Sequence, residues 1–387
     1  MALNDNIQIV PLSRNLWDVL RFLRVSYPIY ENDLHWVAPL LIERKAVFAD
    51  SNPFFEHAEM QLWVAVREGQ DLGRIAGIID RNHDLTTKEA TAFFGFFESI
   101  NEHEIAHQLF QAVANWARQK GFEHLLGPMN PSTNDECGVL VDGYDSSPVF
   151  MMTYNPNYYV GLIEREGFIK AKDLLALHID LSQLPMDRLN RIAAKARARN
   201  PGLELIPVRR RTLPQDVEKI KLVYNSAWQR NWGFVSMTEA EVDFTAAQLK
   251  PLLMEGLSWI AEAEGEPVGL LLAFPDYNVA LKPLRGRLLT PKILGLIPYW
   301  LGIRRPALAR VLTLGVKEEY RGQGVESALL IEALKVGVAK GFREAEASWI
   351  LEDNLMMRRL LEAVGARQYK TYRLYTKPLS IAHSTKL

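Results

Sequence analysis

The chain of 387 residues has a single cysteine, Cys137. An intramolecular disulfide is therefore impossible, and residues 1–6 lack the basic and then apolar character of a signal peptide, so we predict a cytoplasmic location. Long apolar runs are also missing. The most apolar stretch, residues 288–303, is too short to span a bilayer and is interrupted by Pro291, Lys292 and Pro298. We expect no membrane span.

The chain also lacks an excess of charge of either sign. The formal net charge is −1, from 45 basic and 46 acidic residues, which gives no general field for nucleic acid or an anionic surface. The eight histidines are scattered without the spacing of metal ligands. The sequence thus predicts no nucleic-acid partner and no metal.

What the chain does contain is an internal duplication. Residues 7–12 and 63–73 recur at 203–208 and 259–269, both displaced by 196 positions. The displacement has grown to 220 where Gly95 matches Gly315, and it falls to 199 where Asn155 matches Asn354. Two copies of one fold, each with its own insertion, explain these changes. The insertions lie between Leu126 and Asn155 in the first copy and between Phe274 and Val311 in the second.

Each copy shows the same succession of elements. A short strand precedes a helical region, a hairpin, another strand and a long helix that ends at Gly121 or Gly341; a strand, a short helix and a last strand follow. This order predicts an α+β fold with two tandem domains, each a mixed central sheet flanked by helices. We place the domains at 1–180 and 203–387, joined by a basic helical linker over 181–202.

The clearest chemical signal lies in the second copy. The strand 311–316 leads into Arg321-Gly322-Gln323-Gly324-Val325-Glu326-Ser327 and then into a helix. A glycine-rich turn before a helix points several backbone N–H groups outward beside the positive end of the helix dipole. Such a turn predicts a cradle for an anion such as a pyrophosphate.

This stretch resembles the signature of the GCN5-related N-acetyltransferases: Arg or Gln, two residues, Gly, one residue, then Gly or Ala. The resemblance implies that each copy has the acetyltransferase-like fold and that the second copy binds acetyl-coenzyme A or another acyl-coenzyme A. Glu326 stands where the family prefers Gly or Ala, and we expect it to point away from the ligand. By this resemblance, the cofactor-binding residues are Leu314, Gly315, Val316, Arg321, Gly322, Gln323, Gly324, Val325, Ser327 and Asn354.

The resemblance also implies a mechanism. An acceptor amine would attack the thioester directly, with backbone near Val316 polarising the carbonyl. The family's usual tyrosine, seven residues after the Asn, is Leu361 here. The alternatives Tyr369, Tyr372, Tyr375, Glu318 and Glu319 are better explained by packing or solvation, so we assign no catalytic acid or base.

The first copy lacks the motif. Asn101, Glu102 and Glu104 stand where the second copy has Arg321, Gly322 and Gly324. Acidic side chains would repel an anion, so we predict one cofactor site per chain. The first copy would then provide structural support and half of the acceptor site.

The acceptor site is less clearly marked. Polar residues crowd the first insertion, and Arg230 and Asn231 lie between two tryptophans. The alternative is a loop whose side chains satisfy its own turns. Cys137 is best explained as a buried structural thiol. As substrate-binding candidates we take Asn130, Asn134, Glu136, Asp142, Arg230 and Asn231.

These features favour an acyl-coenzyme A-dependent N-acyltransferase, with acetyl transfer to the amine of a small molecule or peptide as the main hypothesis. An alternative is a non-catalytic protein that senses acyl-coenzyme A or a metabolite. A third arises from the apolar insertion 277–310, which would either line a tunnel for a long acyl chain or pack against the first copy or a second subunit. If the insertion packs against a second subunit, the protein forms a homodimer.

Overall fold

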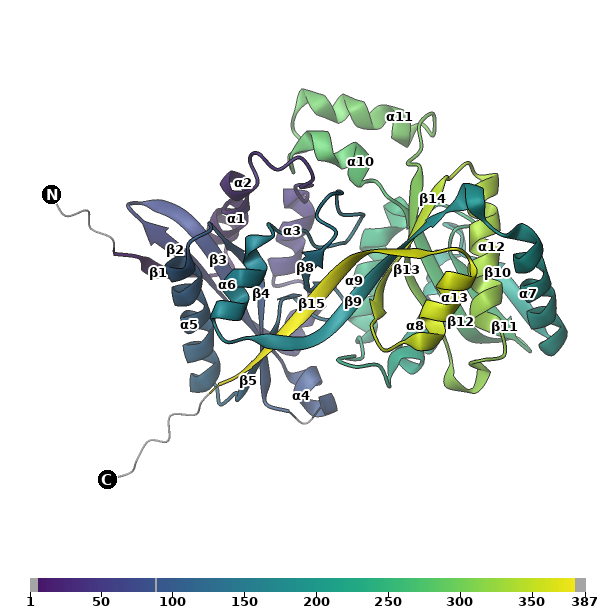
Figure 1. The fold of residues 1–387 in the computed structure, drawn as a ribbon, viewed down its shortest axis with the longest axis horizontal. Coiled ribbons are helices and arrows are strands. Elements are labelled where there is room, and N and C mark those ends of the chain that lie inside the picture. The colour runs from purple at the N-terminus through teal and green to yellow at the C-terminus, as the bar shows by residue number, and fades with distance from the viewer. Residues whose placement is uncertain (1–5, 88, 380–387) are drawn as a thin grey trace. The chain divides into compact units, whose positions relative to one another are not determined.

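The computed structural model describes residues 6–87 and 89–379 (Figure 1). Residues 1–5, which belong to the stretch used above to predict a cytoplasmic location, lie outside the described residues. The chain forms two compact units. Unit 1 comprises the described residues up to Asp173, Leu281–Pro291 and those from Thr371 on; unit 2 comprises Leu174–Ala280 and Lys292–Lys370. Each unit is a mixed sheet flanked by helices, which confirms the predicted fold class.

Unit 1 contains the sheet order β1-β2-β3-β4-β5-β15, with β8 beside β15. Its neighbours are antiparallel except for the parallel pair β4 and β5. The strands are β1 (Gln8–Leu12), β2 (Ala58–Arg67), β3 (Gln70–Asp80), β4 (Thr91–Ser99), β5 (His124–Gly127), β8 (Val139–Asp142) and the end of β15 (Arg367–Pro378), and a separate ribbon pairs β6 (Met129–Asn130) with β7 (Glu136–Cys137).

The helices of unit 1 follow from local sequence signals. Asn15 caps α1 by accepting hydrogen bonds from the backbone N–H groups of Trp17 and Asp18. Helix α5 buries Ile105, Leu109 and Val113, which recur every fourth residue and therefore share one face. The helices are α1 (Leu16–Arg24), α2 (Ser26–Ile29), α3 (Leu41–Phe48), α4 (Arg81–Thr87), α5 (His103–Gln119) and α6 (Tyr158–Arg165), with a 3-10 turn at Pro53–Glu56.

Unit 2 repeats this plan with the order β10-β11-β12-β13-β14-β9. Here β13 and β14 are the parallel pair, and the other neighbours are antiparallel. The strands are β9 (Ile169–Asp180), which starts in unit 1, β10 (Leu203–Pro207), β11 (Trp259–Ala263), β12 (Glu266–Pro275), β13 (Leu308–Val316) and β14 (Glu344–Leu351).

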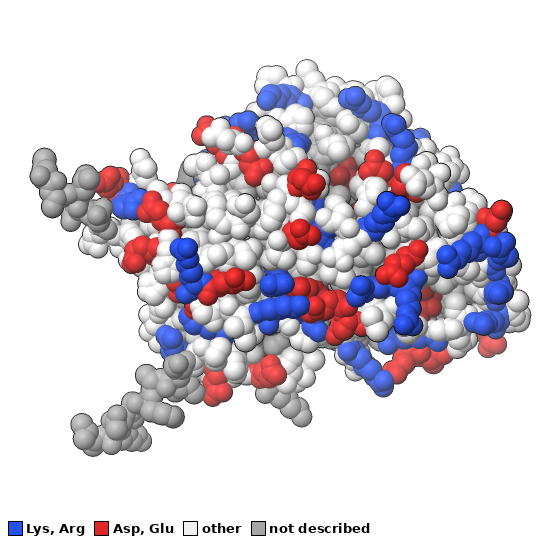
Figure 2. All heavy atoms as spheres, in the orientation of Figure 1, with Lys and Arg blue, Asp and Glu red and all other residues white. Residues whose placement is uncertain are grey.

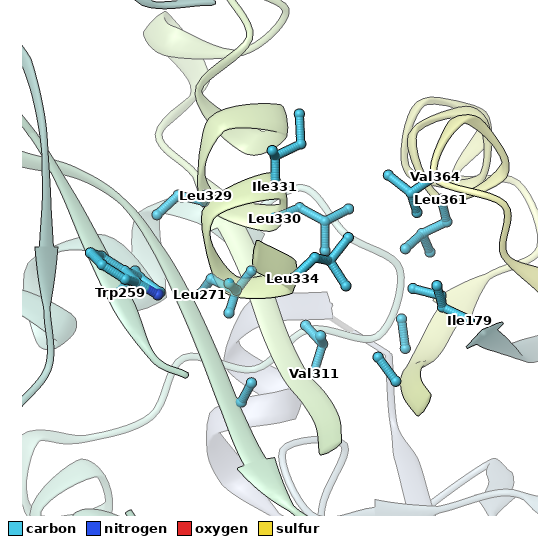
Figure 3. Packing of buried hydrophobic residues seen from close by; sticks show 14 of the residues in the cluster. Ile179, Trp259, Leu271, Val311, Leu329, Leu330, Ile331, Leu334, Leu361 and Val364 are labelled. Carbon is cyan, nitrogen blue, oxygen red and sulfur yellow. The ribbon is translucent and has the colours of Figure 1, made fainter. Parts of the chain in front are cut away.

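Helix α12 (Val325–Ala339) forms the centre of the unit 2 core. Figure 3 shows Leu330 and Leu334 on the side of Leu361 and Val364, with Leu329 on the side of Trp259. The other helices of unit 2 are α7 (Met186–Arg199), α8 (Leu213–Trp228), α9 (Glu239–Leu249), α10 (Asn278–Leu281), α11 (Ile297–Trp300) and α13 (Leu355–Ala363), and 3-10 turns cover Leu181–Gln183, Lys250–Leu252, Pro291–Leu296 (η5) and Glu318–Tyr320 (η6). The 3-10 turn Lys282–Leu284 belongs to unit 1.

The last strands of the two copies are exchanged. Strand β9 follows the first copy along the chain, but its residues from Leu174 on pair with β14 in unit 2. Strand β15 ends the second copy, but its residues from Thr371 on pair with β5 and β8 in unit 1. Each sheet is therefore completed by a strand from the other copy.

Two negative observations apply to the described residues. None of their helices combines the length and the apolar character that crossing a bilayer requires. They also contain no group of three or more His, Cys, Asp or Glu side chains placed to hold a metal ion.

Candidate functional site

The candidate site in unit 2 lies where strands β13 and β14 part. Their parallel pairing ends at Val311 and Ala347, although β13 continues to Val316 and β14 to Leu351. On its other edge, β13 stays paired with β12 as far as Val316. Among the described residues, the stretch from 312 to 316 thus has one edge with no paired strand, and an extended ligand can hydrogen-bond to such an edge.

The carboxyl end of β13 leads into a glycine-rich loop. Gly322 and Gly324 have φ angles of 71° and 95°, which favour glycine, and α12 begins immediately afterwards at Val325. A Cβ added at Gly322 would meet nothing within 4 Å, so the loop is open there. The loop amides and the start of α12 have the arrangement that the sequence predicts, and their role as an anion cradle stays a prediction.

Helix α7, in the predicted linker, braces this loop within unit 2. A Cβ added at Gly324 would lie 2.9 Å from Ala196 Cβ, so only glycine lets the loop approach α7 this closely. Asn200, just after α7, donates a hydrogen bond from Nδ2 to the Gln323 carbonyl at 3.1 Å. The helix also buries Leu189 and Ala193, and hence its apolar face packs against unit 2 while its basic side chains face outward.

Arg321 connects two parts of the site. Its guanidinium donates to the carbonyls of Ala227 at 2.6 Å and Val316 at 3.3 Å, joining the end of α8 to the end of β13. Trp228 follows Ala227, and its ring lies against Gly315, where an added Cβ would be 2.2 Å from a ring atom. The Arg321 side chain therefore positions Trp228, and its backbone belongs to the cradle.

Glu326 does not point away from the loop, contrary to our expectation. Its carboxylate accepts hydrogen bonds from the backbone N–H groups of Glu326 itself and of Gly322, which lower its pKa, but burial has the larger effect and raises it. The side chain turns back because these amides are the nearest donors for a carboxylate on the first helical turn. A pyrophosphate in the cradle would compete with Glu326 for the Gly322 amide.

Asn354 lies at the end of β14 and caps α13. Its Oδ1 accepts a hydrogen bond from the backbone N–H of Met357 at 3.1 Å. The matching residue of unit 1, Asn155, is buried and accepts a hydrogen bond from the Leu140 N–H at 2.7 Å. Asn354 therefore holds the first turn of α13, whereas Asn155 holds the backbone of β8.

A buried charged group that the sequence analysis missed lies next to the parting point. Glu346 on β14 is fully buried one residue before Ala347, the last residue paired with β13. Its Oε2 lies 3.7 Å from Arg310 Nε and accepts a hydrogen bond from Ser348 Oγ at 3.1 Å. Its Oε1 has no hydrogen-bond partner among the described residues. In the sequence Glu346 lies between Ala345 and Ala347, two residues after the partly exposed Glu344, and no local pattern distinguishes the two glutamates.

Burial raises the pKa of Glu346 to about 7, with opposing effects from the Arg310 charge and the Ser348 hydrogen bond. Asp276 raises this pKa further and His178 lowers it. A carboxyl group half ionised at neutral pH is suited to accept a proton and release it again.

The matching opening in unit 1 is filled by the chain itself. Strands β4 and β5 also part, after Phe93 and Leu126, but β6 follows directly and occupies the space. A Cβ at Gly95 would lie 1.7 Å from the Met129 carbonyl oxygen, and Asn130 Oδ1 accepts a hydrogen bond from the Phe96 N–H at 2.6 Å. This part of unit 1 has no room for a ligand on β4.

The start of α5 in unit 1 likewise differs from a cradle. Glu102, which replaces Gly322, accepts two hydrogen bonds from Arg67 at 2.7 and 2.9 Å, and these lower its pKa. Glu104, which replaces Gly324, accepts a hydrogen bond from Gln108. Carboxylates at this helix start leave an anion no favourable position.

The substrate-binding candidates fall into two groups. In unit 1, Asn130 and Glu136 face each other in the β6–β7 ribbon, Glu136 pairs with Arg44, and Asp142 is exposed at the end of β8. Asn134 lies in the loop between β6 and β7, where its N–H donates to Ser132 Oγ. In unit 2, Arg230 pairs with Glu318, and Asn231 lies in the turn after α8. Their contact with an acceptor stays a prediction.

The tyrosines considered as acids have packing roles. Tyr372 and Tyr375 are buried in unit 1, and Tyr375 donates to Glu164 Oε1 at 3.0 Å. The Tyr369 ring lies against His178 in unit 2, with 6.1 Å between ring centroids. Cys137 is buried, as a structural thiol would be.

Two parted parallel strands, a glycine-rich cradle and a following helix define the acyl-coenzyme A-binding fold of the GCN5-related N-acetyltransferases, and this chain belongs to that superfamily. The sequence pattern of the Acetyltransferase (GNAT) family matches residues 220–366. The free edge of β13 and the loop amides suit the pantetheine and pyrophosphate of an acyl-coenzyme A. The second half of the chain thus carries the family's sequence pattern.

Similar proteins match along nearly the whole chain. It is 32% identical over 383 residues to the "Bacterial ceramide synthase" of Caulobacter vibrioides, covering 97% of this chain and 98% of that protein. It is 33% identical to "Protein YghO" of Escherichia coli, covering 94% and 93%. A tandem GNAT protein from the clavulanic acid biosynthesis pathway shares the fold, with a TM-score of 0.58, 15% identity and coverage of 97% and 99%.

Proposed function

We propose that the protein is a long-chain N-acyltransferase that joins the acyl group of an acyl-coenzyme A to the amine of a long-chain amino alcohol. The observation that carries this proposal is the 32% identity to a bacterial ceramide synthase over 98% of its length. A ceramide is the N-acylated form of such an amino alcohol. The parted strands and the cradle in unit 2 support the acyl-coenzyme A requirement.

In this proposal the cradle from Arg321 to Ser327 binds the pyrophosphate, and Glu326 gives up the Gly322 amide to it. The free edge of β13 aligns the pantetheine, and a backbone N–H near Val316 donates to the thioester oxygen as negative charge develops. Trp228, held against Gly315, forms a wall of the site. Asn354 caps the start of α13, just after β14.

Glu346 is the proposed general base. The acceptor ammonium gives one proton to the Glu346 carboxylate, and the amine nitrogen then bonds to the carbonyl carbon as the carbon–sulfur bond breaks. The departing thiolate takes a second proton from the nitrogen, and the third stays on the amide product. Arg310, 3.7 Å away, balances the carboxylate charge in the buried strand.

The test is a turnover assay that crosses acetyl-, octanoyl- and palmitoyl-coenzyme A with sphinganine and with polar amines such as spermidine and lysine. We expect an N-acylated product from sphinganine and palmitoyl-coenzyme A, and little from the polar amines. Efficient acetyl transfer to a polar amine would contradict the long-chain assignment. Binding of coenzyme A without turnover of any pair would favour the sensor hypothesis.

A further inference from the structure

The segment from Lys292 to Arg305 exposes an unusual concentration of large apolar side chains. Trp300 is 85% exposed, Ile303 78% and Leu301 58%. Leu294 and Ile297 of the same segment are exposed as well, and neither η5 nor α11 has a buried residue. Single exposed apolar residues are common on protein surfaces, but a cluster in one short segment marks an interaction site.

The charge of this segment has one sign. Lys292, Arg304 and Arg305 flank the apolar residues, and the sequence has no Asp or Glu between Asp276 and Glu318. In Figure 2, the region at the top, where Figure 1 places α11, shows blue atoms among white ones, and the red atoms lie lower. The segment therefore combines exposed apolar side chains with basic side chains and has no acidic residue of its own.

We propose that residues 292–305, the docking segment, bind the interface of a bilayer that contains anionic phospholipids. Tryptophan and leucine side chains enter the boundary between headgroups and acyl chains, while lysine and arginine stay at the phosphate level. Trp300 and Leu301 lie next to each other in the chain, within four residues of Arg304. The segment therefore has both the apolar side chains and the basic side chains that binding to an anionic bilayer surface requires.

A second copy of the chain is a poorer match. A two-fold interface apposes the same patch of both subunits, so Lys292, Arg304 and Arg305 would meet a copy of the segment that has no acidic residue. Anionic phospholipids supply the opposite charge, with a favourable contribution from each basic side chain near the surface. Charge complementarity thus selects the membrane.

This inference goes beyond the proposed function and does not depend on it, because it rests on exposure and charge and involves none of the residues assigned to the acyl-transfer site. It is tested by cosedimentation of the full chain with phosphatidylcholine vesicles that contain or lack phosphatidylglycerol, without substrates. We expect binding to the anionic vesicles that weakens as salt rises. The double variant Trp300→Ser/Leu301→Ser should lower the partition coefficient on the order of tenfold or more.

A matched control is Trp17→Ser, because Trp17 is 78% exposed on α1, outside the docking segment. It should bind vesicles as the wild type does. Unchanged coenzyme A affinity in the double variant would show that unit 2 is still folded. Absence of wild-type binding to anionic vesicles, or equal loss in both variants, would overturn the proposal. So would a wild-type dimer that the double variant converts to a monomer, without any binding to vesicles.

Discussion

Glu346 is the residue whose environment departs most from that of a surface glutamate. It is fully buried on β14, and the charged or polar groups that act on it are Arg310, Ser348, Asp276 and His178. They come from β13, from β14 itself, from the end of β12 and from β9. Because burial outweighs the effect of Arg310, the carboxyl changes its charge near neutral pH.

We predict that Glu346→Gln lowers kcat roughly a hundredfold or more while leaving acyl-coenzyme A affinity unchanged. A base must be ionised to act, so wild-type kcat should rise with pH through about 7 and then level off. The Glu346→Gln variant should lose this rise, which a loss of structure alone would not remove selectively. Steady-state pH profiles and calorimetric affinities measure both effects.

The control is Glu344→Gln, on the same strand, where the side chain is partly exposed and pairs with His178 at 3.0 Å. We expect a near-normal rate and pH profile. A Glu346→Gln enzyme that kept the rise near pH 7 would assign that titration to another group and refute the role of Glu346.

At the scale of elements, the two copies use one duplicated strand differently. Gly95 of β4 and Gly315 of β13 occupy matching positions, but Gly95 admits the carbonyl of Met129 from β6 whereas Gly315 admits the ring of Trp228. In unit 1 the backbone of Phe96, at φ 50°, donates its N–H to Asn130. The insertion after β5 thus places a piece of the chain against β4 in unit 1, where the matching strand of unit 2 meets Trp228.

We predict that Asn130→Ala lowers the free energy of unfolding by about 1–3 kcal/mol, because the Phe96 N–H loses its acceptor. Urea unfolding monitored by circular dichroism measures the change. Asn115→Ala, at an exposed position of α5, is the matched substitution and should cost much less. Equal stability of the Asn130→Ala variant and the wild type would show that β6 is not held by this bond.

Several elements were predictable from sequence because their signals are local. The hairpin β11–β12, strand β13 and the glycine-rich start of α12 follow from alternation, turn residues and a motif at fixed spacing. The occupation of the opening between β4 and β5 by β6 was not predictable, since Met129 and Asn130 lie within a loop-like stretch rich in turn formers. The burial of Glu346 depends on β9, β13 and β14 coming together, which no local pattern encodes.

For the molecule as a whole, the duplication was predictable from displaced repeats, whereas the strand exchange was not. Strands β9 and β15 are the last strands of the two duplicated copies, and each pairs in the unit that the other copy forms. The structure has β9 paired with β14 and β15 paired with β5. Each sheet consequently depends on both halves of the sequence.

The central claim for the whole molecule is that one copy keeps an acyl-coenzyme A site and the other has lost it. Gly322 provides a clean variant pair, because an added Cβ there meets nothing within 4 Å and Asn and Asp both tolerate a positive φ. Gly322→Asp places a carboxylate in the cradle, as Glu102 does at the matching position of unit 1. Gly322→Asn has nearly the same shape without the charge.

The most direct measurement is an isothermal titration of the full chain with coenzyme A. We predict one site per chain in the wild type, a loss of affinity of roughly tenfold or more in Gly322→Asp, and affinity close to wild type in Gly322→Asn. Two sites per chain, no site, or equal affinity of the Gly322→Asp and Gly322→Asn variants would contradict the account.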